Sequence, residues 1–345
     1  MTAEALDIRT FLQQSKNELL IDVRAPIEFA KGHIPFAINI PLFEDIERAE
    51  IGTLYKQQGK DIAVSRGLEI VSPKMIHFVN EAKALSKNKK VFVYCFRGGM
   101  RSNSFAWLLN TSGLNAKLLQ GGYKAYRNWA LESFEKPQRF IIIGGNTGSG
   151  KTNVLHQLEK EGYKTIDLEK IAHHKGSAFG GINEEKQSPQ QIFENNVAYQ
   201  LDEQNSNEFI LLEDESQNIG YNKIPHGLWL QMKQAPIIKL NIPFEARVFQ
   251  LLNDYTTVDV HLLKQSIIKI SQQLGTLNTT LCLRYLDEGN LIDVARLCLH
   301  YYDKAYNYTY DKKLTQRIIH INAETTDASI NAEKIKNCLS TITLF

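Results

Sequence analysis

The sequence predicts an α/β protein of two domains, each built on a parallel sheet, with a helical part towards the C-terminal end of the second domain. Short apolar runs alternate with helical patterns in the first third of the chain, and the same alternation restarts near residue 139. Strands that alternate with helices are typical of parallel sheets. Residues 244–310 have a mostly helical pattern, and no glycine lies between Gly227 and Gly275. A length of 345 residues agrees with two domains.

The first domain is predicted to cover residues 1–134. Its strands are predicted from three apolar runs, ELLIDVR at 18–24, FAINIP at 36–41 and KVFVYC at 90–95. A helix is predicted over residues 102–113, because Phe105, Leu108 and Leu109 have helical spacing and Gly113 provides a stop. The segment AKLLQGGYKAYRNW that follows predicts a strand, a turn and a second helix.

The second domain is predicted to cover residues 138–345, after a boundary at SFEKPQ (133–138). The run RFIIIGG at 139–145 indicates a buried strand. Further strands are predicted within residues 162–169, 207–215 and 235–243.

The composition favours a protein of the reducing cytoplasm. The chain has 40 basic and 38 acidic residues and a net charge of +2, so its overall charge does not indicate a nucleic-acid-binding protein. Four cysteines, far apart in sequence, form no metal-ligand pattern and fit free thiols. We find no signal-peptide pattern and no apolar run near the roughly 20 residues of a membrane helix. We therefore expect a cytoplasmic protein without membrane contact.

A phosphate-binding loop is the strongest motif in the chain. Residues 145–152, GNTGSGKT, match G-x-x-x-x-G-K-[ST], follow a predicted strand and precede a helical pattern. In such a loop backbone N–H groups converge on an anion, the lysine adds charge, and the threonine hydroxyl reaches a metal ion or phosphate oxygen. The predicted phosphate-binding residues are Gly145, Asn146, Thr147, Gly148, Ser149, Gly150, Lys151 and Thr152. The motif does not decide between a nucleoside triphosphate and another diphosphate.

Two further segments are candidates for the same site. Glu213 and Asp214 follow an apolar run and are candidate Walker-B-like acids. The segment HHKGSAF predicts a shaped loop near the phosphate, with the candidate residues His173, His174, Ser177 and Phe179. We predict no resident metal site and no tightly bound cofactor, while Mg²⁺ with the phosphate ligand stays open.

A second loop carries a cysteine in the pattern C-x5-R-[ST]. Its candidate catalytic residues are Cys95, Arg97, Gly98, Gly99 and Arg101. A thiol between a strand and a helix lies near N–H donors and the positive end of the helix, which stabilise the nucleophilic thiolate. The two arginines add charge for an oxyanion. The same pattern is the protein tyrosine phosphatase signature, so phosphate ester hydrolysis is one interpretation.

The segment upstream resembles the rhodanese family. Residues 21–41, IDVRAPIEFAKGHIPFAINIP, follow the rhodanese pattern D-x-R-x-x-x-E-[FY]-x-x-G-H-I-P-x-A-x-N-I-P nearly residue for residue. The resemblance implies a rhodanese-like fold and a chalcogen carried on Cys95. The common single-domain rhodanese loop is C-x4-R, and this loop is one residue longer. We expect the longer loop to accept a larger, phosphate-sized anion.

The whole chain resembles the tRNA 2-selenouridine synthase family. The resemblance covers nearly the full length and rests on these blocks in family order: DVRAPIEF, GTLYKQQG, CFRGGMRS, GGYKA, GGNTGSGKT, GSAFG, FEN, LEDESQNIG and YYDKAYNY. It implies an N-terminal rhodanese-like domain fused to a P-loop NTPase-like domain.

The resemblance also implies a reaction and its partners. The family replaces the sulfur of 2-thiouridine at the tRNA wobble position with selenium from selenophosphate. It is associated with geranyl transfer, in which geranyl diphosphate alkylates the sulfur first. The implied partners are tRNA and an enzyme that supplies selenophosphate. Cys95 would then receive selenium, and the loop at residues 145–152 would hold the diphosphate.

Two other functions stay open from the residues. A cysteine phosphatase fused to a kinase-like P-loop domain needs an aspartate as general acid, and no sequence feature indicates one. A rhodanese-type sulfurtransferase or persulfide carrier would use Cys95 without a tRNA product.

Overall fold

The computed structural model describes residues 3–204, 208–255, 258–311 and 317–341. The chain divides into two compact units, of which the first contains Met1–Ser133 and Pro189–Tyr199 and the second contains Phe134–Ser188 and Gln200–Phe345. The sequence places residues 189–199 in the second domain, whereas in the structure they pack with the first unit. They form most of helix α10 (Gln190–Glu203), whose polar side chains bond to the first unit.

The first unit is built on a sheet of five parallel strands in the order β1-β5-β4-β2-β3. The strands are β1 (Ala5–Leu6), β2 (Leu19–Asp22), β3 (Ile38–Asn39), β4 (Lys90–Tyr94) and β5 (Asn115–Leu119). The runs predicted at residues 18–24, 36–41 and 90–95 are strands β2, β3 and β4. The predicted parallel sheet is confirmed.

Helices cover both faces of this sheet, so the central strands are apolar on both sides. On one face, Val91 and Val93 of β4 pack in a core with α5 (Met75–Leu85) and α6 (Met100–Thr111). On the other face, the Phe92 ring lies 5.3 Å from that of Phe11. That phenylalanine belongs to α1 (Ile8–Ser15), which contacts α7 (Gly122–Ser133).

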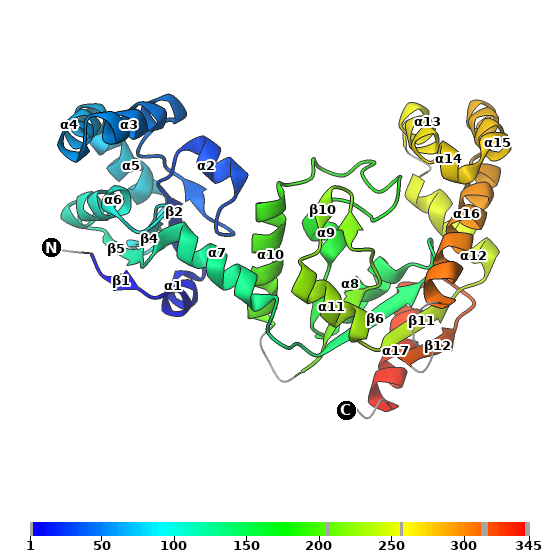
Figure 1. Ribbon diagram of the computed structural model, residues 1–345. Coiled ribbons are helices and arrows are strands. Elements are labelled where there is room, and N and C mark those ends of the chain that lie inside the picture. Colours follow the sequence, from blue (N-terminus) through cyan, green and yellow to red (C-terminus); the bar gives the residue numbers. More distant parts are fainter. Residues whose placement is uncertain (1–2, 205–207, 256–257, 312–316, 342–345) are drawn as a thin grey trace. The chain divides into compact units, whose positions relative to one another are not determined.

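The remaining helices of the first unit are α2 (Pro26–Lys31), α3 (Asp45–Gln57), α4 (Lys60–Val71) and the short 3₁₀ helix η1 (Ser72–Lys74). Helices α3 and α4 lie side by side (Figure 1). Gly67, for which the sequence indicates no role, is buried on α4, where a Cβ atom would lie 3.3 Å from the Phe43 ring. The absence of a side chain at Gly67 therefore permits α4 to pack closely against the Phe43 ring.

The second unit is built on a second parallel sheet, in the order β12-β11-β6-β8-β7. The strands are β6 (Phe140–Gly145), β7 (Thr165–Ile166), β8 (Ile210–Glu213), β11 (Ile237–Asn241) and β12 (Ile318–Asn322). The antiparallel hairpin of β9 (Asn218–Ile219) and β10 (Asn222–Lys223) stands apart. The sequence did not predict β12, which pairs with β11 at the edge of the sheet.

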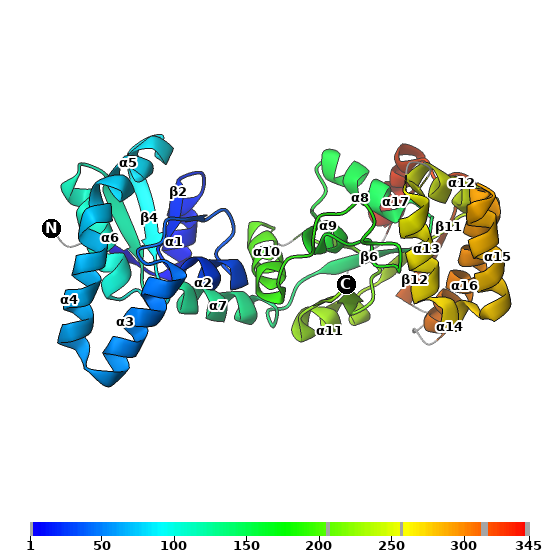
Figure 2. The ribbon, with the colours of Figure 1, turned by 90° about the horizontal axis from the view of Figure 1, so that it is seen from above.

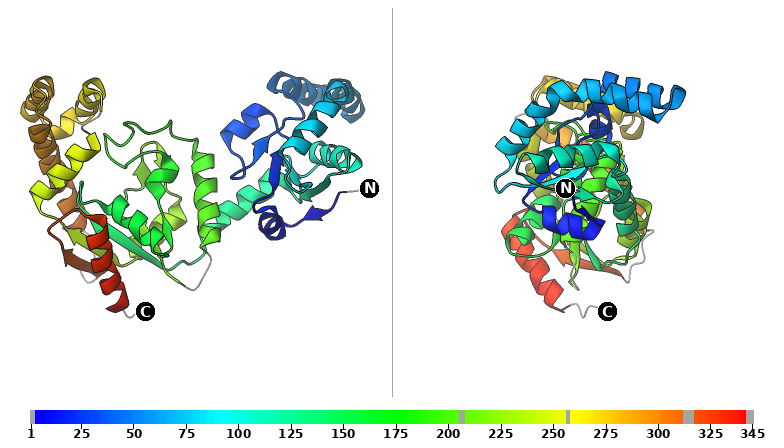
Figure 3. Two further views of the ribbon diagram at one scale, coloured as in Figure 1. Left: turned by 180° about the vertical axis from the view of Figure 1, so that it is seen from behind. Right: turned by 90° about the vertical axis from the view of Figure 1, so that its left-hand side faces the viewer.

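Helices α8 (Lys151–Lys160) and α17 (Ala328–Thr341) lie together against one face of this sheet. Leu155 and Leu158 of α8 share a core with Ile335 of α17, which is red in Figure 3. Helices α9 (Leu168–Ala172) and α11 (His226–Gln234) complete the α/β part, and α11 contacts β6.

The predicted helical part lies between β11 and β12 in sequence, so it is an insertion and not the end of the domain. It contains α12 (Phe244–Tyr255), α13 (Val260–Lys269), α14 (Ser271–Leu274), α15 (Thr276–Asp287) and α16 (Leu291–Asp311), which gather as in Figure 2. These helices share their own core, around Leu263, Ile267 and Cys298. None of the helices in the described part of the chain combines the length and apolar character needed to cross a membrane.

Candidate functional site

Cys95 lies in the turn between strand β4 and helix α6, with Gly99 as the N-cap of the helix. Only 3% of the Cys95 surface is exposed. Its sulfur lies 3.2 Å from the Ser102 hydroxyl oxygen, and the backbone N–H groups of Ser102 and Arg97 interact with it electrostatically. The predicted arrangement of amides around the thiol is therefore present, in a shielded position.

These donors lower the pKa of the Cys95 thiol below its ordinary value. Burial alone raises this pKa, but the Ser102 hydroxyl and the amides of Ser102 and Arg97, together with the charge of Arg101, outweigh burial. The thiolate is the nucleophilic form, so the loop activates the sulfur.

The two arginines of the loop have different positions. Arg101 donates from Nη1 to a carboxylate oxygen of Glu28 at 2.8 Å, and Glu28 also accepts from the Ala25 amide at 3.2 Å. The Arg97 side chain is exposed, with its guanidinium carbon 5.8 Å from the centre of the Phe96 ring. Arg101 is therefore fixed beside the sulfur, whereas Arg97 contributes its backbone amide there.

A second glycine-containing turn, at residues 121–122, supports the cysteine loop from behind. The Cys95 carbonyl accepts from the Tyr123 amide at 2.8 Å, and the Phe96 carbonyl accepts from the Lys124 amide at 3.0 Å. A Cβ atom on Gly122 would lie 2.3 Å from the Cys95 carbonyl oxygen, and the residue has a φ of +60°. Gly98 has a φ of +66° and faces the same turn, while Gly99 has open space around it.

We predict that Gly122→Ala destabilises the protein by at least about 2 kcal/mol, because a left-handed backbone costs a non-glycine residue about 1–2 kcal/mol and the new methyl group also meets the Cys95 carbonyl. Urea unfolding measures the change. Gly113→Ala is the matched control: its φ is +91°, but a Cβ atom there has no neighbour within 4 Å. Equal losses for the two variants would contradict the close packing of the two turns.

The phosphate-binding loop connects the end of β6 to the start of α8, as predicted. Lys151 donates from Nζ to the Gly145 carbonyl at 3.2 Å, and Gly150 precedes the first turn of α8. Burial lowers the pKa of Lys151, but electrostatic interactions with Tyr306, Glu215, Glu213 and Glu169 raise it above its ordinary value. The lysine is therefore charged at neutral pH, with a charge available to an anion.

Three glutamate carboxylates gather near the Thr152 hydroxyl, and two of them are hydrogen-bonded to it. This hydroxyl donates to Glu213 at 3.1 Å and to Glu169 at 3.4 Å. Carboxylate oxygens of Glu169, Glu213 and Glu215 lie within 4.8 Å of one another. Burial, followed by repulsion between these carboxylates, raises the pKa of each to about 8.

Asp214, the second acid that the sequence indicates, is not one of the three carboxylates that converge here. Side chains alternate across an extended chain, so Glu213 and Glu215 point one way and Asp214 the other. Oxygen ligands suit Mg²⁺, and the buried Oε1 atom of Glu213 has no hydrogen-bond partner among the described residues. The cluster therefore fits the Mg²⁺ ion that a phosphate-binding loop implies.

A buried ion pair holds the phosphate-binding loop to the helical insertion. Arg247 of α12 donates to both carboxylate oxygens of Asp303 of α16, at 2.8 and 2.7 Å. Arg247 also donates to the Thr147 carbonyl at 3.2 Å, and the Asn146 amide donates to Asp303 at 2.9 Å. Gly148 lies against the Arg247 carbonyl. Such a bidentate pair fixes geometry, so the insertion shapes the loop.

The Ser149 side chain, by contrast, is buried in the loop, and its hydroxyl has no hydrogen-bond partner in the described part of the chain. The eight residues predicted from the motif run from the last residue of β6 to the second residue of α8. Among them, Asn146 and Thr147 are hydrogen-bonded to residues of the helical insertion.

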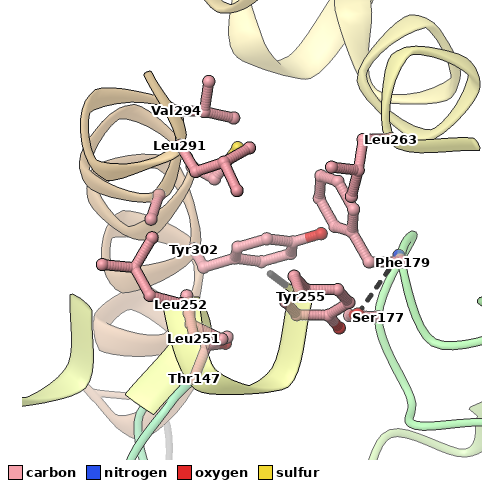
Figure 4. A pocket seen from close by; sticks show the side chains of 12 residues that line it. Thr147, Ser177, Phe179, Leu251, Leu252, Tyr255, Leu263, Leu291, Val294 and Tyr302 are labelled. Atoms are coloured by element: carbon pink, nitrogen blue, oxygen red, sulfur yellow. Dashed lines mark hydrogen bonds between the residues drawn. The ribbon is translucent and has the colours of Figure 1, made fainter. Parts of the chain in front are cut away.

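An apolar pocket adjoins this loop. Its cavity volume is about 60 Å³, and the space reaches about 530 Å³ when the opening to solvent is included. Thr147 of the phosphate-binding loop lines it, and helices α12, α13 and α16 contribute Leu252, Leu263 and Val294. The rings of Tyr255 and Tyr302 project into it (Figure 4). Aliphatic and aromatic walls next to a phosphate site suit a ligand with an apolar chain and an anionic end.

The segment 173–179 contributes only in part to this pocket. Ser177 and Phe179 line it, and the Phe179 amide donates to the Ser177 hydroxyl at 3.2 Å. His173 ends α9 and lies 3.4 Å from a carboxylate oxygen of Glu185. His174 packs against Gly180, and burial lowers its pKa. Neither histidine is among the residues that line the pocket.

Comparison with known proteins shows the family to which this chain belongs. The rhodanese-like domain family matches residues 7–129, and the family described as tRNA 2-selenouridine synthase AAA domain matches residues 138–281. A tRNA 2-selenouridine synthase from Bordetella petrii is 35% identical over 338 residues, which cover 87% of this chain and 88% of that protein. The chain belongs to the tRNA 2-selenouridine synthase family.

Other family members agree in name and extent. The relative from Serratia proteamaculans is 35% identical over 347 residues, 90% of this chain and 91% of that protein. The relative from Shewanella frigidimarina is 42% identical over 247 residues, 70% of this chain and 66% of that protein. The sequence-based resemblance is thereby confirmed at the level of the family.

Several residues at the two sites were not predicted as functional. They are Glu28 and Gly122 at the cysteine loop, and Glu169, Glu215, Arg247 and Asp303 at the phosphate loop. Strand periodicity could have favoured Glu215 over Asp214. No local pattern marks Arg247, because its role depends on a contact with a residue 56 positions away.

Proposed function

We propose that this member of the tRNA 2-selenouridine synthase family replaces the sulfur of 2-thiouridine at the tRNA wobble position with selenium from selenophosphate. We propose further that S-geranyl-2-thiouridine, made from geranyl diphosphate, is the intermediate. The observation that carries the second part is the apolar pocket that begins at Thr147 of the phosphate-binding loop. A diphosphate on that loop would leave its hydrocarbon chain at the mouth of the pocket.

In the geranyl step, the sulfur of 2-thiouridine attacks C1 of geranyl diphosphate, the C1–O bond breaks and diphosphate leaves. Lys151 and the amides of the loop stabilise the charge that builds on the departing diphosphate. Thr152, Glu169, Glu213 and Glu215 would hold Mg²⁺, which supplies further charge for the same group. The pocket walls exclude water from the allylic carbon.

In the selenium step, the loop amides with Arg97 and Arg101 hold selenophosphate, and the Cys95 thiolate attacks its phosphorus. The S–P bond forms, the Se–P bond breaks and selenide is released, and water later hydrolyses the phosphorylated cysteine to phosphate and the free thiol. The lowered pKa of the thiol and the fixed position of Arg101 support this role. The selenide then attacks C2 of the uridine, the C2–S bond breaks and geranyl thiol leaves with a proton. Alkylation makes this departure favourable, since a thiol leaves more readily than sulfide.

The test is mass spectrometry of nucleosides from 2-thiouridine tRNA incubated with the protein, geranyl diphosphate and selenophosphate. We expect 2-selenouridine with both co-substrates and S-geranyl-2-thiouridine when selenophosphate is omitted. Turnover of thiosulfate without a tRNA product would indicate a sulfurtransferase instead. Hydrolysis of p-nitrophenyl phosphate without a tRNA product would indicate a phosphatase.

We predict that Val294→Trp blocks geranyl transfer, because the larger side chain fills the pocket beside Leu252 and Leu263. Formation of S-geranyl-2-thiouridine should fall at least tenfold, mainly through a higher KM for geranyl diphosphate. Ile292→Trp is the matched control on the same helix, since Ile292 is 41% exposed and does not line the pocket. Unchanged geranylation by Val294→Trp would show that the geranyl group does not bind in this pocket.

A further inference from the structure

Helix α10 contains a buried asparagine, Asn195, whose side chain is fully hydrogen-bonded to other residues of the first unit. Asn195 is completely buried. Its Nδ2 group donates to the His33 carbonyl at 2.6 Å and to the Tyr123 hydroxyl at 2.9 Å, and its Oδ1 atom accepts from Arg127 at 2.5 Å. Its backbone carbonyl accepts from the Tyr126 hydroxyl at 3.0 Å. A buried polar network of this kind holds one geometry when every member is satisfied.

The partners of Asn195 lie on one face of helix α7. Tyr123, Tyr126 and Arg127 are at positions i, i+3 and i+4, which places them side by side. Arg127 also donates to a carboxylate oxygen of Glu194 at 2.5 Å. One short segment of α10 therefore fixes the rotation and position of the first turns of α7.

The first turn of α7 in turn orients the peptide units of the cysteine loop. Its amides at Tyr123 and Lys124 bind the carbonyls of Cys95 and Phe96. In a trans peptide the C=O and N–H groups point in opposite directions. Because the Phe96 carbonyl faces α7, the Arg97 amide of the same peptide unit faces away from α7, and it interacts electrostatically with the Cys95 sulfur.

We propose that Asn195 is a positioning residue for the cysteine: it fixes Tyr123, and through the first turn of α7 it orients the peptide units of residues 95–97. The proposal rests on the role of Cys95 proposed above. Asn195 lies between β7 and β8 in sequence, within the segment that separates the phosphate-site acids Glu169 and Glu213. Helix α10, which lies in sequence between two strands of the second sheet, thus contributes a residue that supports the cysteine loop.

Charged groups packed around the loop can also influence the pKa of the Cys95 thiol. Arg101 of α6 faces it and is paired with Glu28 of α2, which also lies 3.7 Å from Arg48 of α3. Beneath Tyr123, the guanidinium carbon of Arg24 lies 3.9 Å from the ring centre and is paired with buried Asp22. None of these pairs includes Asn195. Its replacement removes one partner of Arg127, which keeps its ion pair with Glu194.

The experiment measures alkylation of Cys95 by iodoacetamide against pH in the full chain, with the Cys95 peptide followed by mass spectrometry. In Asn195→Ala we expect the midpoint of the profile to move up towards that of a free thiol. A shift of one pH unit lowers the rate at neutral pH about tenfold. Asn196→Ala is the matched control, because this neighbouring asparagine has no side-chain hydrogen bond to a described residue, and its profile should equal that of the natural chain.

Tyr123→Phe provides a second variant with a smaller change. It removes only the hydroxyl that accepts from Asn195, and its profile should move in the same direction by a smaller amount. Circular dichroism and thermal unfolding establish that each variant is folded. A folded Asn195→Ala protein with an unchanged profile would overturn the proposal. Alkylation needs neither tRNA nor selenium, so this outcome is independent of whether the proposed reaction occurs.

Discussion

Replacement of Cys95 by serine is expected to abolish formation of 2-selenouridine while S-geranyl-2-thiouridine still accumulates. Serine is close in size to cysteine and can keep the contact with the Ser102 hydroxyl, so the loop should stay folded. Its hydroxyl, however, does not ionise near neutral pH, and the amides that lower the pKa of the thiol cannot make it a comparable nucleophile. The geranyl step uses residues 145–152 and the apolar pocket, which belong to the second unit, whereas Cys95 belongs to the first.

The measurement is nucleoside mass spectrometry, with the selenated and geranylated products quantified from one reaction. Cys338→Ser is the matched control, because this half-buried thiol lies on α17 and burial raises its pKa. It should give normal amounts of both products. If Cys95→Ser produced 2-selenouridine at the rate of the natural chain, Cys95 would not be the nucleophile that acts on selenophosphate.

The fold could be predicted from the sequence where the pattern is local. Buried parallel strands form continuous apolar runs, as in RFIIIGG, and the helices between them have their own period. Strand β12 was missed because its residues are only partly buried and polar His320 interrupts the apolar run. The docking of Asn195 on α7 was missed because it joins residues 68 and 72 positions apart, which no local pattern records.

The candidate sites divide in the same way. The positions of both candidate loops could be predicted, because the chemistry proposed for them requires contiguous residues between a strand and a helix. The groups that orient those loops come from distant segments. Glu28 holds Arg101 across 73 positions, and Arg247 binds Thr147 across 100 positions. Sequence alone therefore indicates the candidate reactive groups, and the structure adds the groups that hold them.

Lys151→Ala is expected to lower geranyl transfer by about 10²–10³-fold, the typical cost of removing one group that stabilises a developing negative charge. The lysine is charged, lies at the Gly145 carbonyl and is surrounded by acids, so its removal leaves the negative charge of the diphosphate facing Glu213 and Glu215. The loss should therefore appear in kcat as well as in KM.

The sharpest measurement supplies each tRNA separately. On 2-thiouridine tRNA with geranyl diphosphate, Lys151→Ala should form little S-geranyl product, whereas Lys160→Ala, an exposed lysine at the end of the same helix, should be normal. On tRNA that already carries S-geranyl-2-thiouridine, Lys151→Ala should still form 2-selenouridine from selenophosphate, because Cys95 and its loop are intact. Failure with both tRNAs would mean that Lys151 also acts in the selenium step. Normal geranylation by Lys151→Ala would show that this loop does not bind the diphosphate.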